Sequence, residues 1–256
     1  MKKVCIFNQK GGVGKTTSNI NMCAYLALEG YKVLAIDIDP QGNTTSGLGF
    51  DKKALDKSIY DVLTTDMPIK EVILESQLIN NFFLAPSTIE LAGAEVELAH
   101  MDNRETILKK KLEELDDKYD FIFIDCPPSL GFLTINALTA VHSVLIPIQC
   151  EFYALEGVVQ VVNTIDLIKQ SLNPDLYIEG VIMSMYDSRT RLCNEVVAEV
   201  KAYFKDKVYN SAIPRNIRLA ESPSYGLPIV LYDKSCRGAK AYEEVTKEFL
   251  SKQEVN

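Results

Sequence analysis

The 256-residue sequence lacks tryptophan, has only two histidines and contains no long apolar run. No stretch approaches the roughly 18 consecutive apolar residues that a membrane span requires. Lys2 and Lys3 are followed by only a four-residue apolar run, which is too short for a signal peptide. His100 and His142 adjoin no candidate nucleophile, so neither is assigned a catalytic role. We therefore expect a cytoplasmic protein without a membrane span.

Paired cysteines are also missing. The six cysteines are scattered without any C-x-x-C pair, which argues against a zinc site, an iron–sulfur cluster and a secreted disulfide framework. We expect reduced thiols that are mostly buried.

The acidic and basic residues are unevenly distributed. The formal charge is −8 overall, but residues 181–256 carry 12 Lys and Arg against 10 Asp and Glu, a balance of +2. Residues 1–180 carry the remaining 15 against 25, a balance of −10. A polyanionic partner is therefore expected to bind the last third of the chain.

Apolar and helical segments alternate along the chain. Near-continuous apolar runs that end in polar clusters are typical of parallel strands covered on both faces. The expected strands are 4–8, 32–39, 82–86, 121–128, 143–150 and 178–185, with 207–214 as a weaker candidate, and the expected helices are 15–29, 104–118, 154–172, 191–205 and 238–252. This order predicts a doubly wound α/β fold with a mostly parallel sheet and helices on both faces. We expect one domain, 1–256, with no helix-turn-helix before the first strand.

The turn after the first strand is rich in glycine. Residues 10–17 read KGGVGKTT, close to the phosphate-binding pattern G-x-x-x-x-G-K-[ST], but Gln9 stands where the first glycine belongs. Gly11, Gly12 and Gly14 allow backbone N–H groups to approach phosphate oxygens closely.

The side chains that follow these glycines suit a bound nucleoside triphosphate. Lys15 would bridge the β- and γ-phosphates, Thr16 offers its hydroxyl to Mg²⁺, and Thr17 can donate to the α-phosphate. A second lysine, Lys10, is not explained by this pattern.

Three carboxylates follow apolar strands. Asp37 and Asp39 end the strand 32–39, and their alternation predicts that both point to one face. Asp37 suits indirect contact with Mg²⁺, and Asp39 could orient the attacking water. Asp125 follows four apolar residues, the pattern of a carboxylate that holds Mg²⁺ through a water.

Together these segments resemble the deviant Walker A ATPases of the ParA/MinD group over nearly the whole chain. The resemblance is carried by KGGVGKTT at 10–17, DIDPQGN at 37–43 and IDCPPSLG at 124–131. TSGLG at 45–49, LAGAEVEL at 91–98 and IPRNIRLAESPSYGLPI at 213–229 are most similar to the small chromosomal ParA (Soj) proteins.

The resemblance implies a slow, Mg²⁺-dependent, partner-stimulated ATPase that dimerises with ATP. Loop residues 10–17, Val13 included, would bind the nucleotide, and Lys10 would reach the partner's phosphates, which makes Lys10, Lys15 and Asp39 the catalytic candidates. Pro214 and Arg215 would flank the adenine. Thr16, Asp37 and Asp125 would serve the metal.

The resemblance also implies partners. Arg189 and Arg218 match positions that bind DNA without sequence preference, and a ParB-like centromere-binding protein would stimulate hydrolysis. The implied role is chromosome or plasmid partitioning at the nucleoid, with control of replication or sporulation left open.

Two rival functions remain to be tested. A MinD-type membrane-cycling ATPase should end in a basic amphipathic helix, but the last sixteen residues, AYEEVTKEFLSKQEVN, carry four glutamates against two lysines. A metabolic ATP-dependent ligase on the same fold would turn over without DNA.

Overall fold

A seven-stranded sheet forms the centre of the computed structural model, which describes residues 1–115, 118–151 and 154–254. The strand order is β3-β4-β2-β5-β1-β6-β7. β3 pairs antiparallel with β4 at one edge, and the other pairings are parallel. The strands are β1 (Lys2–Ile6), β2 (Val33–Asp37), β3 (Leu74–Glu75), β4 (Phe82–Ala85), β5 (Phe121–Asp125), β6 (Ser143–Gln149) and β7 (Tyr177–Ser184).

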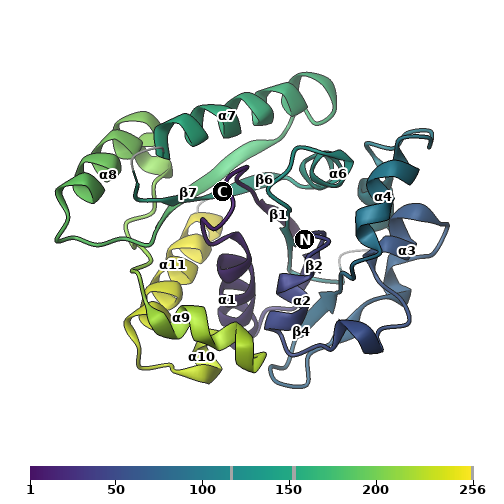
Figure 1. Ribbon diagram of the computed structural model, residues 1–256, viewed down its shortest axis with the longest axis horizontal. Helices are drawn as coiled ribbons and strands as arrows, with labels where there is room; N and C mark the ends of the chain where they lie inside the picture. The colour runs from purple at the N-terminus through teal and green to yellow at the C-terminus, as the bar shows by residue number, and fades with distance from the viewer. Residues whose placement is uncertain (116–117, 152–153, 255–256) are drawn as a thin grey trace.

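Helices cover both faces of the sheet, so the predicted fold class is confirmed (Figure 1). Apolar residues of α1, α9, α10 and α11 form one core, and those of α3 to α8 form the other. The helices are α1 (Lys15–Leu28), α2 (Asn43–Gly47), α3 (Ile59–Thr64), α4 (Leu91–Leu98), α5 (Ile107–Glu113), α6 (Phe132–Ala140), α7 (Ala154–Ser171), α8 (Arg191–Phe204), α9 (Ile217–Glu221), α10 (Ile229–Tyr232) and α11 (Arg237–Glu254).

The three strands that precede the sequence motifs lie side by side. β5 is central, between β2 and β1, and Asp125 is in register with both Asp37 and Ile6. All five residues of β2 and of β5 are buried because helices pack on both sides of the sheet. The carboxyl ends of these strands therefore bring the glycine-rich turn and the aspartates to one edge of the sheet.

Two predicted elements differ in the structure. Residues 207–214 do not form a strand; Val208 and Pro214 make only isolated bridges, to Val181 and Tyr186. The Asn210 N–H instead donates to the Glu248 carboxylate of α11 at 2.9 Å, which removes it from any strand ladder. α5 is shorter than the predicted helix 104–118, of which residues 116–117 lie outside the described part.

Within the described ranges, no helix combines the length and apolar character needed to cross a bilayer. The six cysteines all lie within the same ranges and none forms a disulfide; four of them are buried.

Candidate nucleotide-binding site

Hydrogen bonds from neighbouring residues fix the glycine-rich loop between β1 and α1 in place. Gly12 and Gly14 have φ values of 75° and 94°, which favour glycine, and Gly14 is the N-cap of α1. Asn8 accepts from the Lys10 N–H at 2.9 Å and donates to the Pro147 carbonyl at 2.8 Å. The free N–H groups at the start of α1 and the positive end of its dipole therefore face the loop, as an anion site requires.

Gln9, the departure from the usual pattern, ties the loop to α7. Its amide donates to the Thr164 hydroxyl at 3.0 Å. Val13 is buried, and its carbonyl accepts from the Ser184 hydroxyl at 2.8 Å. Both contacts fix the loop from the side of β6 and β7.

The two lysines of the loop lie in different surroundings. Lys15 is 7% exposed, and its ammonium donates to the Lys10 carbonyl at 3.0 Å. Burial lowers the pKa of Lys15, an effect that the Asp125 carboxylate opposes. Lys10 is half-exposed and forms an ion pair with Glu151, just after β6. Lys15 is thus positioned inside the site, whereas Lys10 lies at its rim.

Thr16 and two aspartates form the floor of the site. Asp125 accepts from the Thr16 hydroxyl at 2.7 Å and from the Thr44 hydroxyl at 2.8 Å. Asp37 accepts from both the N–H and the hydroxyl of Thr45 at 2.8 Å. The start of α2 is therefore held by both strand-end carboxylates.

The two carboxylates carry perturbed pKa values. Burial, with the neighbouring Asp125 charge, raises the pKa of Asp37 to about 7. Burial also raises the pKa of Asp125 to about 6, against the lowering effect of hydrogen bonds from Thr16 and Thr44. When both carboxyl groups are ionised, their neighbouring negative charges are poorly compensated unless a cation binds close by.

Asp39 lies beyond the strand and not on it. β2 ends at Asp37, so strand alternation, on which the prediction rested, does not apply to Asp39. The backbone turns there: the Asp39 N–H donates to Asp37 at 3.2 Å, and Asp39 accepts from the Gln41 N–H at 2.8 Å. Asp39 nevertheless lines the cavity beside the loop.

The donor set fits Mg²⁺ bound together with phosphates. The Asp125 Oδ1 atom is buried and has no hydrogen-bond partner among the described residues. Mg²⁺ prefers oxygen ligands and usually combines one or two carboxylates with phosphates and waters. Among those residues no cluster of three or more His, Cys, Asp or Glu could hold a metal alone. Thr16 and Asp125, which are hydrogen-bonded to each other, offer oxygens for such a shared site.

A cavity of about 350 Å³ lies over the loop. Its lining includes three of the loop glycines, Lys15 to Thr17 at the start of α1, and Asp39 and Pro128. This cavity lies at the start of α1 and includes Lys15 in its lining, as a polyphosphate chain requires, and we call it the phosphate cavity.

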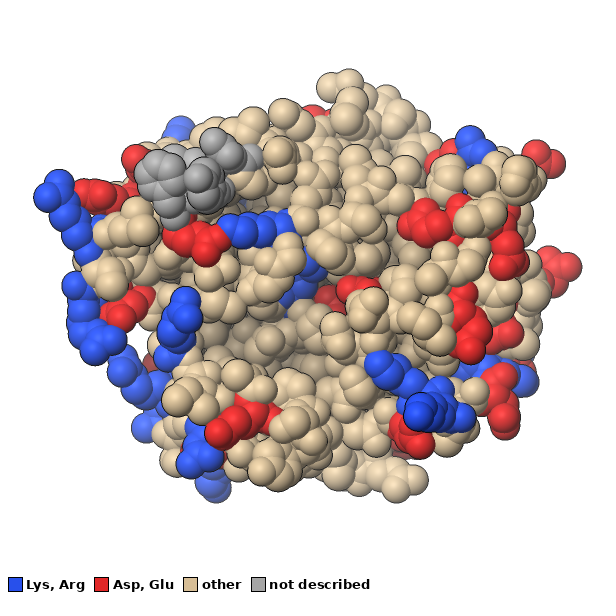
Figure 2. All heavy atoms as spheres, in the orientation of Figure 1, with Lys and Arg blue, Asp and Glu red and all other residues tan. Residues whose placement is uncertain are grey.

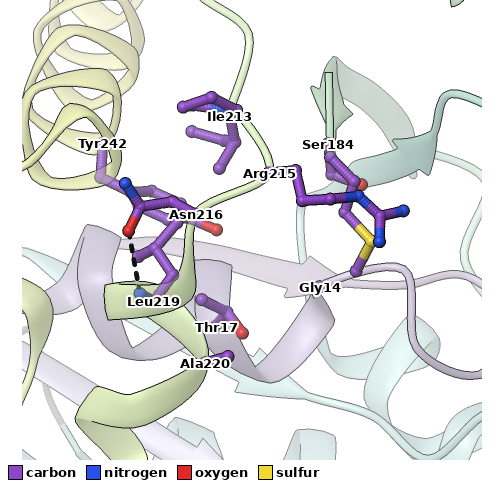
Figure 3. Close-up of a pocket in the computed structure, with 11 residues that line it drawn as sticks. Gly14, Thr17, Ser184, Ile213, Arg215, Asn216, Leu219, Ala220 and Tyr242 are labelled. Atoms are coloured by element: carbon purple, nitrogen blue, oxygen red, sulfur yellow. Dashed lines mark hydrogen bonds between the residues drawn. The ribbon is translucent and has the colours of Figure 1, made fainter. Parts of the chain in front are cut away.

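A second cavity, of about 230 Å³, shares Gly14, Thr17 and Met185 with the first. Figure 3 shows Gly14 and Thr17 below and the segment Ile213 to Asn216 above, with Tyr242 of α11 at the left. Its lining is mostly apolar, which suits the base of a nucleoside, and we call it the nucleoside cavity. The structure therefore brings Pro214 and Arg215 to the loop from about 200 residues away in the chain.

The basic residues of the last third gather on one edge of the molecule. Figure 2 shows Lys and Arg along this edge, over α8 and the region of α9 and α10, and acidic residues at the opposite edge. Arg189 is 86% exposed and forms a bidentate pair with Asp187, at 2.7 and 2.9 Å. Arg218 is 54% exposed and pairs with Glu221 at 3.0 Å. Such exposed pairs are weak, so a phosphate could replace the carboxylate.

A groove of about 430 Å³ lies beside the nucleoside cavity, and we call it the arginine groove. Arg189, Arg215 and Arg237 line it, and Pro214 and Arg215 form a wall shared with the nucleoside cavity. Arg218 does not line the groove. Arg237 was not among the predicted site residues, and no local sequence pattern places it beside Arg189.

Several residues that stabilise the site were not predicted from the sequence. Thr44 and Thr45 follow DPQGN directly, and their hydroxyls beside a motif were a usable signal. Glu151 and Ser184 carried no such signal, because they reach the loop only through the packing of β6 and β7.

Comparisons with known proteins agree with this geometry. A model of the AAA domain family matches residues 1–178. The chain is 54% identical over 247 residues to the sporulation initiation inhibitor protein Soj of Bacillus subtilis, covering 96% of this chain and 97% of that protein. It is 51% identical to the chromosome-partitioning ATPase Soj of Treponema pallidum, covering 98% of each.

Among solved structures, cobyrinic acid a,c-diamide synthase from Mycobacterium smegmatis, with bound ATP analogue and magnesium, superposes with a TM-score of 0.86. It is 37% identical and the match covers 99% of this chain and 96% of that one. Matches of this identity and coverage show the family: the chain belongs to the AAA domain family and, within it, to the ParA/Soj group of chromosome-partitioning ATPases.

Proposed function

We propose that this chain is a Mg²⁺-dependent ATPase switch of chromosome partitioning, which binds ATP across the two joined cavities and dimerises in response to it. The observation that carries the proposal is the contact of Thr16 with Asp125 at 2.7 Å beside the buried Lys15, at the start of α1. Hydroxyl, carboxylate and ammonium are thus grouped where the β- and γ-phosphates of ATP would lie.

Each residue of the site has a distinct task. The loop N–H groups and Lys15 bind the phosphates, and the apolar cavity lined by Pro214 and Tyr242 receives the base. Mg²⁺, held by Thr16 and the phosphates with Asp125 behind it, neutralises charge on the transferring phosphoryl group. Asp39, in the cavity wall, orients the attacking water, and Asp37 fixes the start of α2 through Thr45.

Lys10 provides the dependence on a second subunit. Charge on the γ-phosphoryl group requires a cation, and a cation supplied by the partner completes the site only in the dimer. Lys10 suits this role because it lies at the rim of the site and its present partner, Glu151, is half-exposed. ATP would therefore favour the dimer, whereas ADP, which lacks the γ-phosphate, would not.

The basic edge supports non-specific DNA binding by the dimer. Arg189 and Arg218 lie on that edge with exposed guanidinium groups, and backbone phosphates bind such groups without base readout. A ParB-like centromere-binding protein would then stimulate hydrolysis and release the DNA. Bound to chromosomal DNA, the protein would lie at the nucleoid.

The test is ATP turnover with Mg²⁺, measured with and without duplex DNA and the cell's ParB-like protein. We expect turnover that is slow alone and rises when both are added. Lys15→Ala is the matched control, since it removes the phosphate-binding ammonium. A rate of ATP turnover that does not change when DNA and the ParB-like protein are added would contradict the partitioning function.

A metabolic ATP-dependent ligase is the second candidate, since the structure from Mycobacterium smegmatis bears the name of a diamide synthase. Such an enzyme would require a carboxylic-acid substrate for turnover. The same assay, with cobyrinic acid and an ammonia donor in place of DNA, separates the two functions.

A further inference from the structure

Helix α6 begins without a cap from its own segment. Its N-cap residue is Gly131, which has no side chain to accept the N–H groups of the first turn. The Glu95 carboxylate, from α4, takes this place: it accepts from the Phe132 N–H at 2.7 Å and from the Leu133 N–H at 3.3 Å. A carboxylate at this end of a helix is also favoured by the helix dipole.

The first turn of α6 in turn holds the loop that follows Asp125. The Thr134 hydroxyl donates to the Ser129 carbonyl at 2.7 Å, and the adjacent Pro128 lines the phosphate cavity. A continuous set of contacts therefore joins Glu95 to the lining of this cavity at Pro128, through the first turn of α6.

Glu95 and Gly131 fit each other closely. A Cβ atom at position 131 would lie 2.7 Å from the Glu95 Cδ atom and closer still to its Oε1 atom, so no side chain fits there while the carboxylate is in place. The backbone of Gly131, with φ −116° and ψ −171°, is extended and open to any residue. A side chain at this position would therefore displace the Glu95 carboxylate from the start of α6, and would do so by its volume and not through the backbone conformation.

The rest of α6 does not depend on Glu95. Leu133, Ala137 and Leu138 are buried in the core, and the Asn136 amide donates to the Arg104 carbonyl at 2.6 Å. Loss of the carboxylate would therefore free the first turn and the loop before it while the helix stays packed.

We propose that Glu95 is a positioning residue for ATP hydrolysis, which holds the loop 126–131 against the phosphate cavity by capping α6. The inference rests on the proposed ATPase function. It predicts a loss of turnover without a loss of nucleotide binding, because the loop contributes one wall of the cavity while the glycine-rich loop contributes the phosphate ligands.

The test compares four variants of the full chain with Mg²⁺ and duplex DNA. Glu95→Ala should lower kcat about 10- to 100-fold, the range expected when a reacting group is misplaced by about 1 Å, and should leave the Kd of a fluorescent ATP analogue unchanged. Glu97→Ala is the matched control, because Glu97 lies on the same helix and bonds the Tyr60 hydroxyl instead. Gly131→Ser alone should also lower kcat, because its Cβ meets Glu95.

The double variant Glu95→Ala with Gly131→Ser supplies the decisive result. The serine then has room, and its hydroxyl can cap α6 from the N-cap position, so kcat should recover toward the wild-type value. Recovery is not expected if Glu95 acts only by its charge or by general stability.

Two results would overturn the inference: Glu95→Ala turning over as fast as Glu97→Ala, or a double variant no faster than either single one. If Glu95→Ala fails to fold, Glu95→Gln decides. Its amide oxygen still accepts an N–H, so near-wild-type turnover would support the capping role, and a loss of turnover as large as that expected for Glu95→Ala would contradict it. A wild-type protein without any ATP turnover would instead refute the proposed function.

Discussion

Replacing Asp125 by asparagine should stabilise the nucleotide-free protein at pH 8 while it impairs binding of Mg²⁺ and ATP. Asp125 and Asp37 are both fully buried and in register on neighbouring strands. Their raised pKa values, about 6 and about 7, mean that the folded chain holds their protons more tightly than the ordinary value of 3.8 would allow. Ionisation of the pair therefore opposes folding.

The sign of the pH dependence follows from proton counts. Between about pH 4 and pH 7 the folded state binds more protons at these carboxyl groups than the unfolded state does, so the free energy of unfolding falls as pH rises. Since one pKa unit corresponds to about 1.4 kcal/mol, the Asp125 shift alone is on the order of 1 to 3 kcal/mol at pH 8. For a chain of this size that is roughly 2 to 10 °C in Tm.

The assay is thermal unfolding of the wild type and Asp125→Asn at pH 5 and pH 8. The asparagine side chain cannot ionise, and its oxygen can still accept from Thr16 and Thr44, so the variant should melt higher at pH 8. Its advantage should be smaller at pH 5, where the unfolded carboxyl group is already ionised but the folded one is still mostly protonated. Saturating Mg²⁺ and ATP should reverse the order at pH 8, because only the wild type gains the full binding free energy. A variant that melts lower at pH 8, or that keeps an equal advantage at pH 5, would refute the reasoning.

Three further substitutions test the assigned roles. Lys10→Ala should bind ATP but lose the ATP-dependent dimer, because no other side chain is assigned to the partner's γ-phosphate; light scattering that shows an intact dimer would contradict this. Asp39→Ala should bind ATP and dimerise but hydrolyse slowly, and a loss of ATP affinity as large as that of Lys15→Ala would assign Asp39 to binding instead. Arg189→Glu or Arg218→Glu should weaken ATP-dependent binding to unrelated DNA duplexes and reduce its dependence on salt. For about four to eight phosphate contacts, the wild-type slope of log affinity against log salt concentration should be on the order of −4 to −7. An affinity that does not change with salt would exclude electrostatic binding to the phosphates.

The sequence predicted what is encoded locally. β1, β2 and β5 are near-continuous apolar runs, and α1 is bounded by Gly14 and by Gly30, which has a φ of 95°. α3 was missed although Ser58 and Asp61 form a capping box before it, a local signal that could have been used.

The rest could not be predicted because it depends on contacts between distant segments. Glu95 caps a helix that starts 37 residues later in the chain, after Gly131, and no property of LAGAEVEL indicates this. Similarly, Arg237 reaches the groove of Arg189 only because α11 packs beside α1 and α9. Tertiary packing, and not the motif, decides which charges become neighbours.

The wall formed by Pro214 and Arg215 has a thermodynamic consequence. One face of this wall lines the nucleoside cavity and the other lines the arginine groove, and its backbone is fastened to Tyr186, whose N–H donates to the Ile213 carbonyl at 2.9 Å. If a ligand on one face shifts the wall and so changes affinity on the other face, the coupling free energy must be the same in both directions. DNA bound in the groove would then raise the affinity for ATP by the same factor by which ATP raises the affinity for DNA, so that chromosomal DNA would itself act as an effector that retains the nucleotide.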